Sequence, residues 1–126
     1  MSKERYPLFI TVLKAMGLPP PQTEYIIEVP DYLNVFYFNY LPKKHWRIDY
    51  FWPNLKIAVE IDGGAFLAGG GGHNRGAGFR RDIVRHNTFT SQGITLFRFM
   101  PEHLPTKSTY AVSLLMAYFR EKGYTL

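Results

Sequence analysis

The chain has no cysteine among its 126 residues. This absence excludes a disulfide framework and thiolate metal ligands, and it is typical of proteins that work in a reducing compartment. The sequence also has no long apolar run and no charged-then-apolar leader of the kind that directs export. We therefore expect neither a membrane span nor export, and we expect a cytoplasmic location.

The length and composition predict one domain that spans residues 1–126. Aromatic residues make up 17% of the chain, so we expect a core built largely from rings. The sequence contains no internal repeat.

The formal net charge of +5 is concentrated in the middle of the chain. Residues 43–85 contain eight basic and four acidic side chains, and the basic ones are Lys43, Lys44, Arg47, Lys56, Arg75, Arg80, Arg81 and Arg85. A positive surface of this kind favours a polyanionic partner, with nucleic acid as the first candidate. An ordinary solvated basic surface is the alternative.

Residues 46–61 have the pattern of a β-hairpin. Apolar and aromatic types alternate over residues 46–52 and again over residues 55–61, and Pro53 and Asn54 between them are turn residues. One predicted strand contains Asp49, whereas the other ends with Glu60 and Asp62. Trp52 is expected in the core, although stacking on an opened base is an alternative role for it.

The three hairpin carboxylates suggest a metal site. A carboxylate in an apolar strand costs free energy on burial unless a cation satisfies it. Mg²⁺ prefers oxygen ligands, which the side chains of Asp49, Glu60 and Asp62 and the carbonyl of Ile61 would supply. In the alternative interpretation, Asp49 pairs with a nearby arginine such as Arg47 or Arg98, and residues 60–62 are simply the end of a strand.

The rest of the chain predicts helices and strands around this hairpin. We expect helices at 3–17, 79–92 and 106–122, strands at 23–29 and 94–99, a turn at 102–105, and either a strand pair or an excursion at 31–40. Gly17, Gly93 and Gly123 are the predicted helix stops. The resulting fold class is α/β or α+β, with a central mixed sheet flanked by helices.

Residues 63–78 include eight of the eleven glycines, and we predict a loop there. The segment lacks the Lys and Ser/Thr of a phosphate-binding nucleotide loop. His73 and Arg75 are its side chains with useful chemistry, and His73 is either a general acid or base or an exposed loop histidine.

The predicted helix at 79–92 has polar and apolar faces. We expect Phe79, Ile83 and Phe89 to be buried. Asp82 is one turn from both Arg85 and His86, so a pair between Asp82 and one of these two is expected.

The order of these motifs resembles that of the PD-(D/E)XK nuclease superfamily, and within it the small very-short-patch-repair-like endonucleases of bacteria and phages. The resemblance covers about residues 17–100. Its motifs are Gly17–Pro19 with Glu24 and Tyr25, Trp46–Tyr50, Ala58–Gly64, Gly72–Gly76, Gly78 and Phe79, Asp82, Arg85, Asn87, Gly93, and Leu96–Phe99.

The resemblance implies a restriction-endonuclease-like core and a Mg²⁺-dependent phosphodiesterase in which Mn²⁺ could replace Mg²⁺. It makes Asp49 and Glu60 the metal ligands and Glu24 an auxiliary carboxylate. The superfamily's lysine two positions after the second acid is Asp62 here, and Lys56 lies further back on the same strand face. Arg85, His73 and Arg75 are the other candidates for orienting water or stabilising charge.

The basic residues would then bind phosphates, which sets affinity and not sequence preference. This set comprises Lys43, Lys44, Arg47, Arg75, Arg80, Arg81 and Arg85. The expected location is the cytoplasm of a bacterium, or of the host if a phage encodes the protein.

Three functions remain open from the sequence. The first is a structure-directed DNA endonuclease that acts on branched, mismatched or nicked DNA, and a homodimer would favour junction resolution. The second is a catalytically silent nucleic-acid-binding or nuclease-inhibiting module with the same fold. The third is a sugar- or nucleotide-binding domain whose glycine-rich loop surrounds a small ligand.

Overall fold

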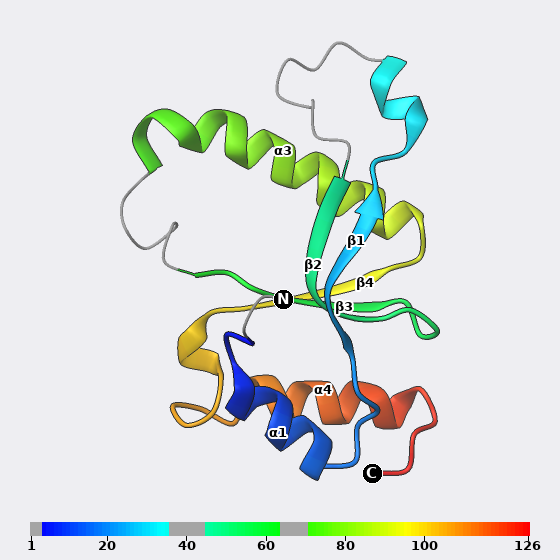
Figure 1. Cartoon of the computed structure of the whole chain (residues 1–126), viewed down its shortest axis with the longest axis vertical. Helices are drawn as coiled ribbons and strands as arrows, with labels where there is room; N and C mark the ends of the chain where they lie inside the picture. Colours follow the sequence, from blue (N-terminus) through cyan, green and yellow to red (C-terminus); the bar gives the residue numbers. More distant parts are fainter. Residues whose placement is uncertain (1–3, 36–44, 64–70) are drawn as a thin grey trace. The chain divides into compact units, whose positions relative to one another are not determined.

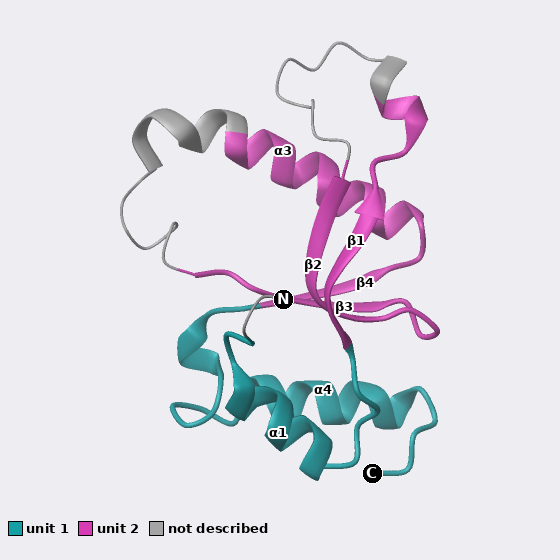
Figure 2. Ribbon diagram, viewed as in Figure 1, with its two compact units in different colours: residues 1–21, 99–126 teal, residues 22–98 magenta. Residues whose placement is uncertain are grey.

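The computed structural model describes the backbone of residues 4–35, 45–63 and 71–126, and the side chains of these residues except 34, 35 and 71–77. The chain forms two compact units (Figure 2). One unit comprises residues 22–98, and the other comprises residues 1–21 together with residues 99–126.

A four-stranded sheet with the order β1-β2-β3-β4 forms the centre of the first unit (Figure 1). Its strands are β1 (Gln22–Glu28), β2 (His45–Trp52), β3 (Ile57–Ile61) and β4 (Thr95–Phe99). β1 pairs antiparallel with β2, and β2 pairs antiparallel with β3. Because the sheet is mixed, β3 and β4 are its parallel pair, and helix α3 (Gly71–Ser91) lies between them in the chain. The fold is α+β, which is one of the two classes that the element order left open.

The predicted hairpin is present as β2 and β3. A turn at residues 53–56 joins the strands, and the backbone N–H of Lys56 donates to the carbonyl of Pro53 at 3.2 Å. Trp52 is buried, which supports its expected core role. Phe51 is buried as well, although the alternation places it on the opposite face from Trp52. Both faces of the sheet are therefore covered near this turn.

Helix α3 packs on the sheet through Phe89, whose ring meets that of Trp46 edge-on at a centroid distance of 5.6 Å. The cluster around this contact consists of Leu33, Trp46, Ile48, Phe51, Ala58, Phe89 and Ile94. The predicted buried face of this helix is wrong at two positions, because Phe79 and Ile83 are exposed. Asp82, Arg85 and Phe89 follow one another at spacings of three and four residues, so the two polar residues lie on the same inward face of the helix as Phe89.

The glycine-rich segment is also partly mispredicted as a loop. Helix α3 begins at Gly71, so residues 71–78 are helical. Glycine disfavours a helix by about 1 kcal/mol per residue, but such propensities are weak and the longer helix overrides them. Residues 64–70 of the predicted loop lie outside the described residues.

The sequence left open whether residues 31–40 form a strand pair or an excursion, and the structure decides this only for residues 31–35. Residues Asp31–Val35 form a 3₁₀ turn in place of a strand, and the N–H of Leu33 donates to the carbonyl of Pro30 at 3.1 Å. Pro30 favours such a turn because its ring cannot continue a strand ladder. Residues 36–40 lie outside the described part of the chain.

The second unit contains helices α1 (Pro7–Ala15) and α4 (Tyr110–Glu121), which contact each other, and a 3₁₀ turn at Pro101–His103. Phe9 and Leu13 of α1 and Leu115 and Phe119 of α4 are fully buried. Helix α4 starts four residues later than predicted. The hydroxyl of Ser108 accepts the N–H of Tyr110 at 3.0 Å, and this side chain marks the helix start.

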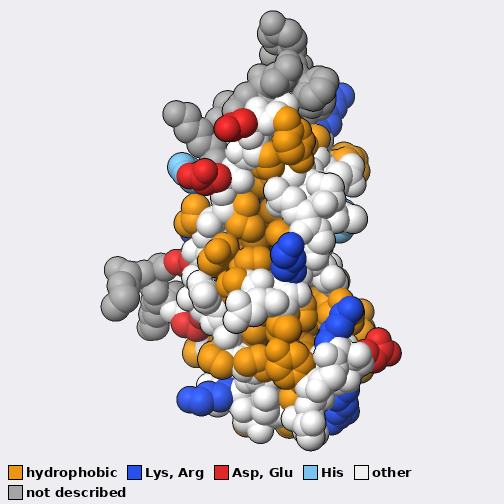
Figure 3. Space-filling model, turned by 90° about the vertical axis from the view of Figure 1, so that its right-hand side faces the viewer, with side chains coloured by type: hydrophobic (Ala, Val, Ile, Leu, Met, Phe, Trp, Pro, Cys, Tyr) orange, Lys and Arg blue, Asp and Glu red, His pale blue; other side chains and the backbone are white. Residues whose placement is uncertain are grey.

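All three predicted helix stops are confirmed. Gly17, Gly93 and Gly123 have φ values of 92°, 79° and 97°, which are accessible to glycine at low cost. Within the described residues, no helix has both the length and the apolar character needed to cross a membrane. Hydrophobic side chains do reach the surface (Figure 3). The exposed large hydrophobic residues include Ile26, Phe79 and Tyr110.

Candidate functional site

Asp49 and Glu60 are neighbours across the β2–β3 hairpin. The regular pairing of β2 with β3 ends at Tyr50 and Val59, and beyond it the Asp49 side chain accepts the N–H of Ile61, the residue directly after Glu60. Glu24 lies on the other side of Asp49, because the pairs Thr23–Tyr50 and Tyr25–Ile48 flank this position. Along the three adjacent strands, Asp49 on β2 thus lies between Glu24 on β1 and Glu60 on β3.

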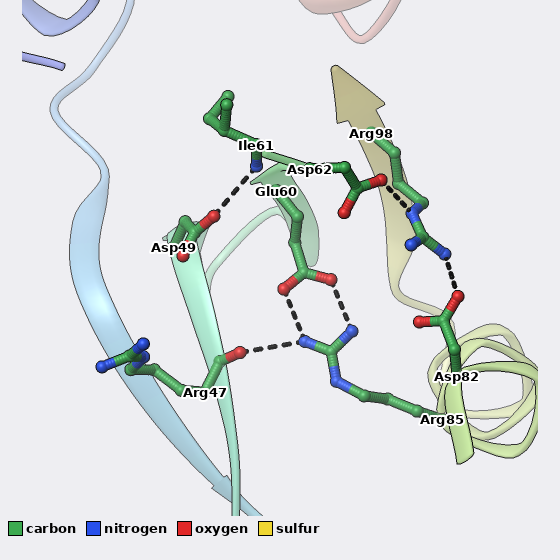
Figure 4. A network of polar contacts seen from close by, with 8 residues as sticks. All are labelled: Arg47, Asp49, Glu60, Ile61, Asp62, Asp82, Arg85 and Arg98. Carbon is green, nitrogen blue, oxygen red and sulfur yellow. Dashed lines mark hydrogen bonds and ion pairs between the residues drawn. The ribbon is translucent and has the colours of Figure 1, made fainter. Parts of the chain in front are cut away.

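The Asp49 carboxylate is half-buried, and its Oδ2 accepts the backbone N–H of Ile61 at 2.9 Å (Figure 4). Among the residues that the structure describes, Asp49 forms no ion pair. The interpretation in which Arg47 or Arg98 neutralises Asp49 is therefore wrong for the described structure, since both arginines bind other carboxylates. Ile61 contributes its N–H to this contact, while its carbonyl remains only a predicted metal ligand.

Glu60 has a different environment, because Arg85 from α3 binds both of its carboxylate oxygens. Nη1 of Arg85 lies 2.5 Å from Oε1 of Glu60, and Nη2 lies 2.6 Å from Oε2. Nη2 also donates to the carbonyl of Arg47 at 2.9 Å. Both side chains of the pair are largely buried, at 14% and 13% exposure. The Arg85 guanidinium further lies over the ring of Phe89, 4.7 Å from its centroid.

Asp62 belongs to a second charge cluster. Nε of Arg98 on β4 donates to Oδ2 of Asp62 at 2.8 Å, and its Nη1 donates to Oδ2 of Asp82 on α3 at 2.6 Å (Figure 4). The hydrogen bond to Asp62, and then that to Asp82, raises the pKa of Arg98 against the opposing effect of burial. The expected pairing of Asp82 with Arg85 or His86 is wrong, because Asp82 contacts β4.

Glu24 lies at the outer end of the acidic row. Its Oε1 is 3.7 Å from Nη1 of Arg47, and both side chains are well exposed. An exposed pair at this distance contributes at most about 1 kcal/mol. The backbone of Glu24 has φ of 48°, an uncommon value for a residue with a side chain, and Glu24 is missing from the regular strand pairing.

Lys56 is not brought to the carboxylates. It precedes β3, whereas Glu60 lies near the opposite end of that strand. Its ammonium group donates to the carbonyl of Gln92 at 3.3 Å, which is at the C-terminal end of α3. A cation there is favourable because the last carbonyls of a helix have no partner within the helix.

The predicted phosphate-binding residues differ in their exposure. Arg47 and Arg80 are exposed, Arg81 is half-buried, and Arg85 is bound to Glu60. The side chains of His73 and Arg75, and all of Lys43 and Lys44, lie outside the described residues.

The carboxylates of the candidate site fit an oxygen-ligated metal ion only in part. Within the described residues, no three Asp, Glu, His or Cys side chains gather closely enough to coordinate one ion. Asp49, Glu60 and Asp62 therefore do not form a three-carboxylate site. Asp49 and Glu60 still provide two neighbouring carboxylates, which is enough for Mg²⁺ when water and substrate phosphate complete its shell.

Sequence reasoning missed how the arginines are distributed among these acids. The available signals were the 3–4 spacing of Asp82, Arg85 and Phe89, and the single charge of Arg98 in an otherwise apolar strand. Comparisons of the chain with protein-family models, with curated proteins and with solved structures found no match.

Proposed function

We propose that the protein is a metal-dependent DNA endonuclease whose ion is held by Asp49 and Glu60. The observation that supports this most strongly is the state of Asp49. It is a half-buried carboxylate that accepts the N–H of the residue directly after Glu60, and within the described residues no cation neutralises it. Such a group attracts a cation, because a charge removed from water needs a counter-charge nearby.

The proposed reaction is hydrolysis of a phosphodiester bond, in which water adds to phosphorus and one P–O bond breaks. Asp49 and Glu60 would position a Mg²⁺ or Mn²⁺ ion, which supplies Lewis-acid stabilisation of the charge that develops on the phosphate. The Ile61 N–H fixes one oxygen of Asp49 and leaves the other for the ion. Arg47 and Arg80, both exposed, would bind flanking phosphates.

The contacts of α3 support one choice of substrate class. The described residues of α3 are bound to the sheet through Asp82, Arg85 and Phe89, so this stripe is not free to read base edges. We therefore favour a nuclease directed by DNA structure, acting on branched, mismatched or nicked duplexes. A homodimer would place two active sites on one junction.

A second candidate is a catalytically silent nucleic-acid-binding module. It is favoured by the bidentate Arg85–Glu60 pair, which engages both oxygens of one proposed ligand. It is also favoured by Asp62, which stands where the resembled superfamily has lysine and which is bound to Arg98. A binding module needs only its basic surface, so its affinity would depend on salt and not on divalent metal.

A cleavage assay on labelled DNA separates the two candidates. The substrates are a single strand, a duplex, a nicked duplex, a flap and a four-way junction, each with Mg²⁺, with Mn²⁺ or with chelator. A nuclease is expected to cut at least one substrate only with metal, and Glu60→Gln is expected to abolish the cut. Arg120→Gln is the matched control, because Arg120 is exposed on α4 and belongs to the other unit. Binding of every substrate without cutting would support the silent module.

A further inference from the structure

The Arg85–Glu60 pair raises the question of how Glu60 can serve an ion. Its carboxylate is 13% exposed, and both oxygens accept hydrogen bonds from one guanidinium. A carboxylate in this position is costly without a counter-ion, so one cation or another must neutralise it in every state of the folded protein.

Resting on the metal-dependent function proposed above, we propose that Arg85 is a positioning residue that competes with the divalent ion for Glu60. In the metal-free protein, Arg85 orients and neutralises the Glu60 carboxylate. With an ion held by Asp49 and Glu60, the Glu60 charge would be neutralised by that ion, and Arg85 would give up at least one of its two hydrogen bonds to Glu60.

The charges around the pair support this competition. With Arg85 in place, Asp49 and Glu60 retain one net negative charge, and no other cation is paired with them among the described side chains. A divalent ion neutralises both carboxylates and leaves the guanidinium without a counter-charge. Like charges a few ångströms apart repel strongly in a partly buried site, so the guanidinium and the ion cannot both keep close contact with Glu60.

Arg85 can move away without losing every partner. Its Nη2 also donates to the Arg47 carbonyl, and its guanidinium lies over the Phe89 ring. Both contacts are independent of the Glu60 carboxylate. They provide an alternative position for the guanidinium, from which it could donate hydrogen bonds to a phosphate oxygen as its new counter-charge.

The test measures Mn²⁺ binding by the whole chain. Calorimetry gives the affinity, and thermal unfolding with Mn²⁺ or with chelator gives the effect of the ion on the melting temperature. Arg85→Gln removes the competing charge, so its Mn²⁺ affinity is expected to rise by about tenfold or more above that of the unaltered protein. Its melting temperature is expected to fall in chelator and to rise more on adding Mn²⁺ than that of the unaltered protein. A purely structural role for Arg85 would lower the melting temperature without strengthening Mn²⁺ binding.

Three further variants keep the result interpretable. Arg85→Lys retains the charge but loses the two-pronged contact, so it is expected to fold and to bind Mn²⁺ with intermediate affinity. Glu60→Gln is expected to lose the Mn²⁺ response, and Arg120→Gln is expected to behave as the unaltered protein does. If Arg85→Gln fails to fold, the comparison rests on Arg85→Lys.

Failure of the competition by Arg85 and failure of the proposed function give different results. Equal Mn²⁺ affinity in the unaltered protein, Arg85→Gln and Arg85→Lys would overturn the competition and leave the proposed ion site standing. Absence of Mn²⁺ binding in all of these proteins would overturn both the competition and the proposed function.

Discussion

Arg98 on β4 donates its Nε–H to the carboxylate of Asp62, which directly follows β3, at 2.8 Å. The same guanidinium reaches Asp82 on α3 at 2.6 Å, so one side chain joins two parallel neighbouring strands to the helix between them. Asp62 is the residue that replaces the lysine expected from the resembled superfamily. In this structure it acts as an ion-pair partner within the sheet.

We predict that Arg98→Met destabilises the fold modestly. The pairs are about one-third exposed, so water screens them and their combined contribution is roughly 1 kcal/mol. Chemical denaturation monitored by tryptophan fluorescence measures this, because Trp46 and Trp52 lie in the same unit. Arg98→Lys, which keeps the charge, should lose less. Unchanged stability in Arg98→Met would show that the contacts do not connect these elements in solution.

Two phenylalanines on α3 test which face of the helix is buried. Phe89 is fully buried against Trp46, so Phe89→Ala should cost about 3–5 kcal/mol. Phe79 is 58% exposed, and Phe79→Ala should change the free energy of unfolding by no more than ~0.5 kcal/mol. The two substitutions are chemically identical, so each is the control for the other. A large loss in Phe79→Ala would contradict the orientation of the helix.

Lys56 provides a test of the catalytic assignments. Its ammonium group is bound to the Gln92 carbonyl and lies away from the hairpin carboxylates. If the protein cuts DNA, Lys56→Met should therefore retain cleavage within about twofold, with a small loss of stability from the weakened helix end. Single-turnover cleavage measures the chemical step separately from binding. A hundredfold loss at unchanged DNA affinity would instead assign Lys56 to the reaction.

The sequence predicted most of the fold because local signals agreed with the tertiary structure there. Alternating apolar residues around Pro53 and Asn54 predicted the hairpin, and three glycines marked helix ends that the structure confirms by their positive φ. The helical start at Gly71 could not be predicted in the same way. Glycine has a low intrinsic helix propensity, and only the extension of a packed helix overrides it.

The candidate site was harder to predict, because charge pairing depends on contacts between distant segments. The hairpin pattern was sufficient to place Asp49 and Glu60 on the two adjacent strands β2 and β3. It could not reveal that Arg85 would face Glu60, since a helical pattern assigns arginine to the solvent face and apolar residues to the core. The inward face of α3 with Asp82, Arg85 and Phe89 is determined by contacts with the sheet, and the partners of Arg85 there, Glu60 and Arg47, lie 25 and 38 residues away in the chain.

Asp49 gives the most direct test of the central proposal, because Asp49→Asn keeps the side-chain shape and breaks no ion pair among the described residues. The measurement is cleavage of the preferred DNA by unaltered protein and by Asp49→Asn, with Mg²⁺ and with chelator, beside DNA binding by both. We predict metal-dependent cleavage that falls by at least about a hundredfold in the variant, with DNA binding equal or tighter. Equal cleavage by both proteins would contradict the assignment of Asp49 as a metal ligand.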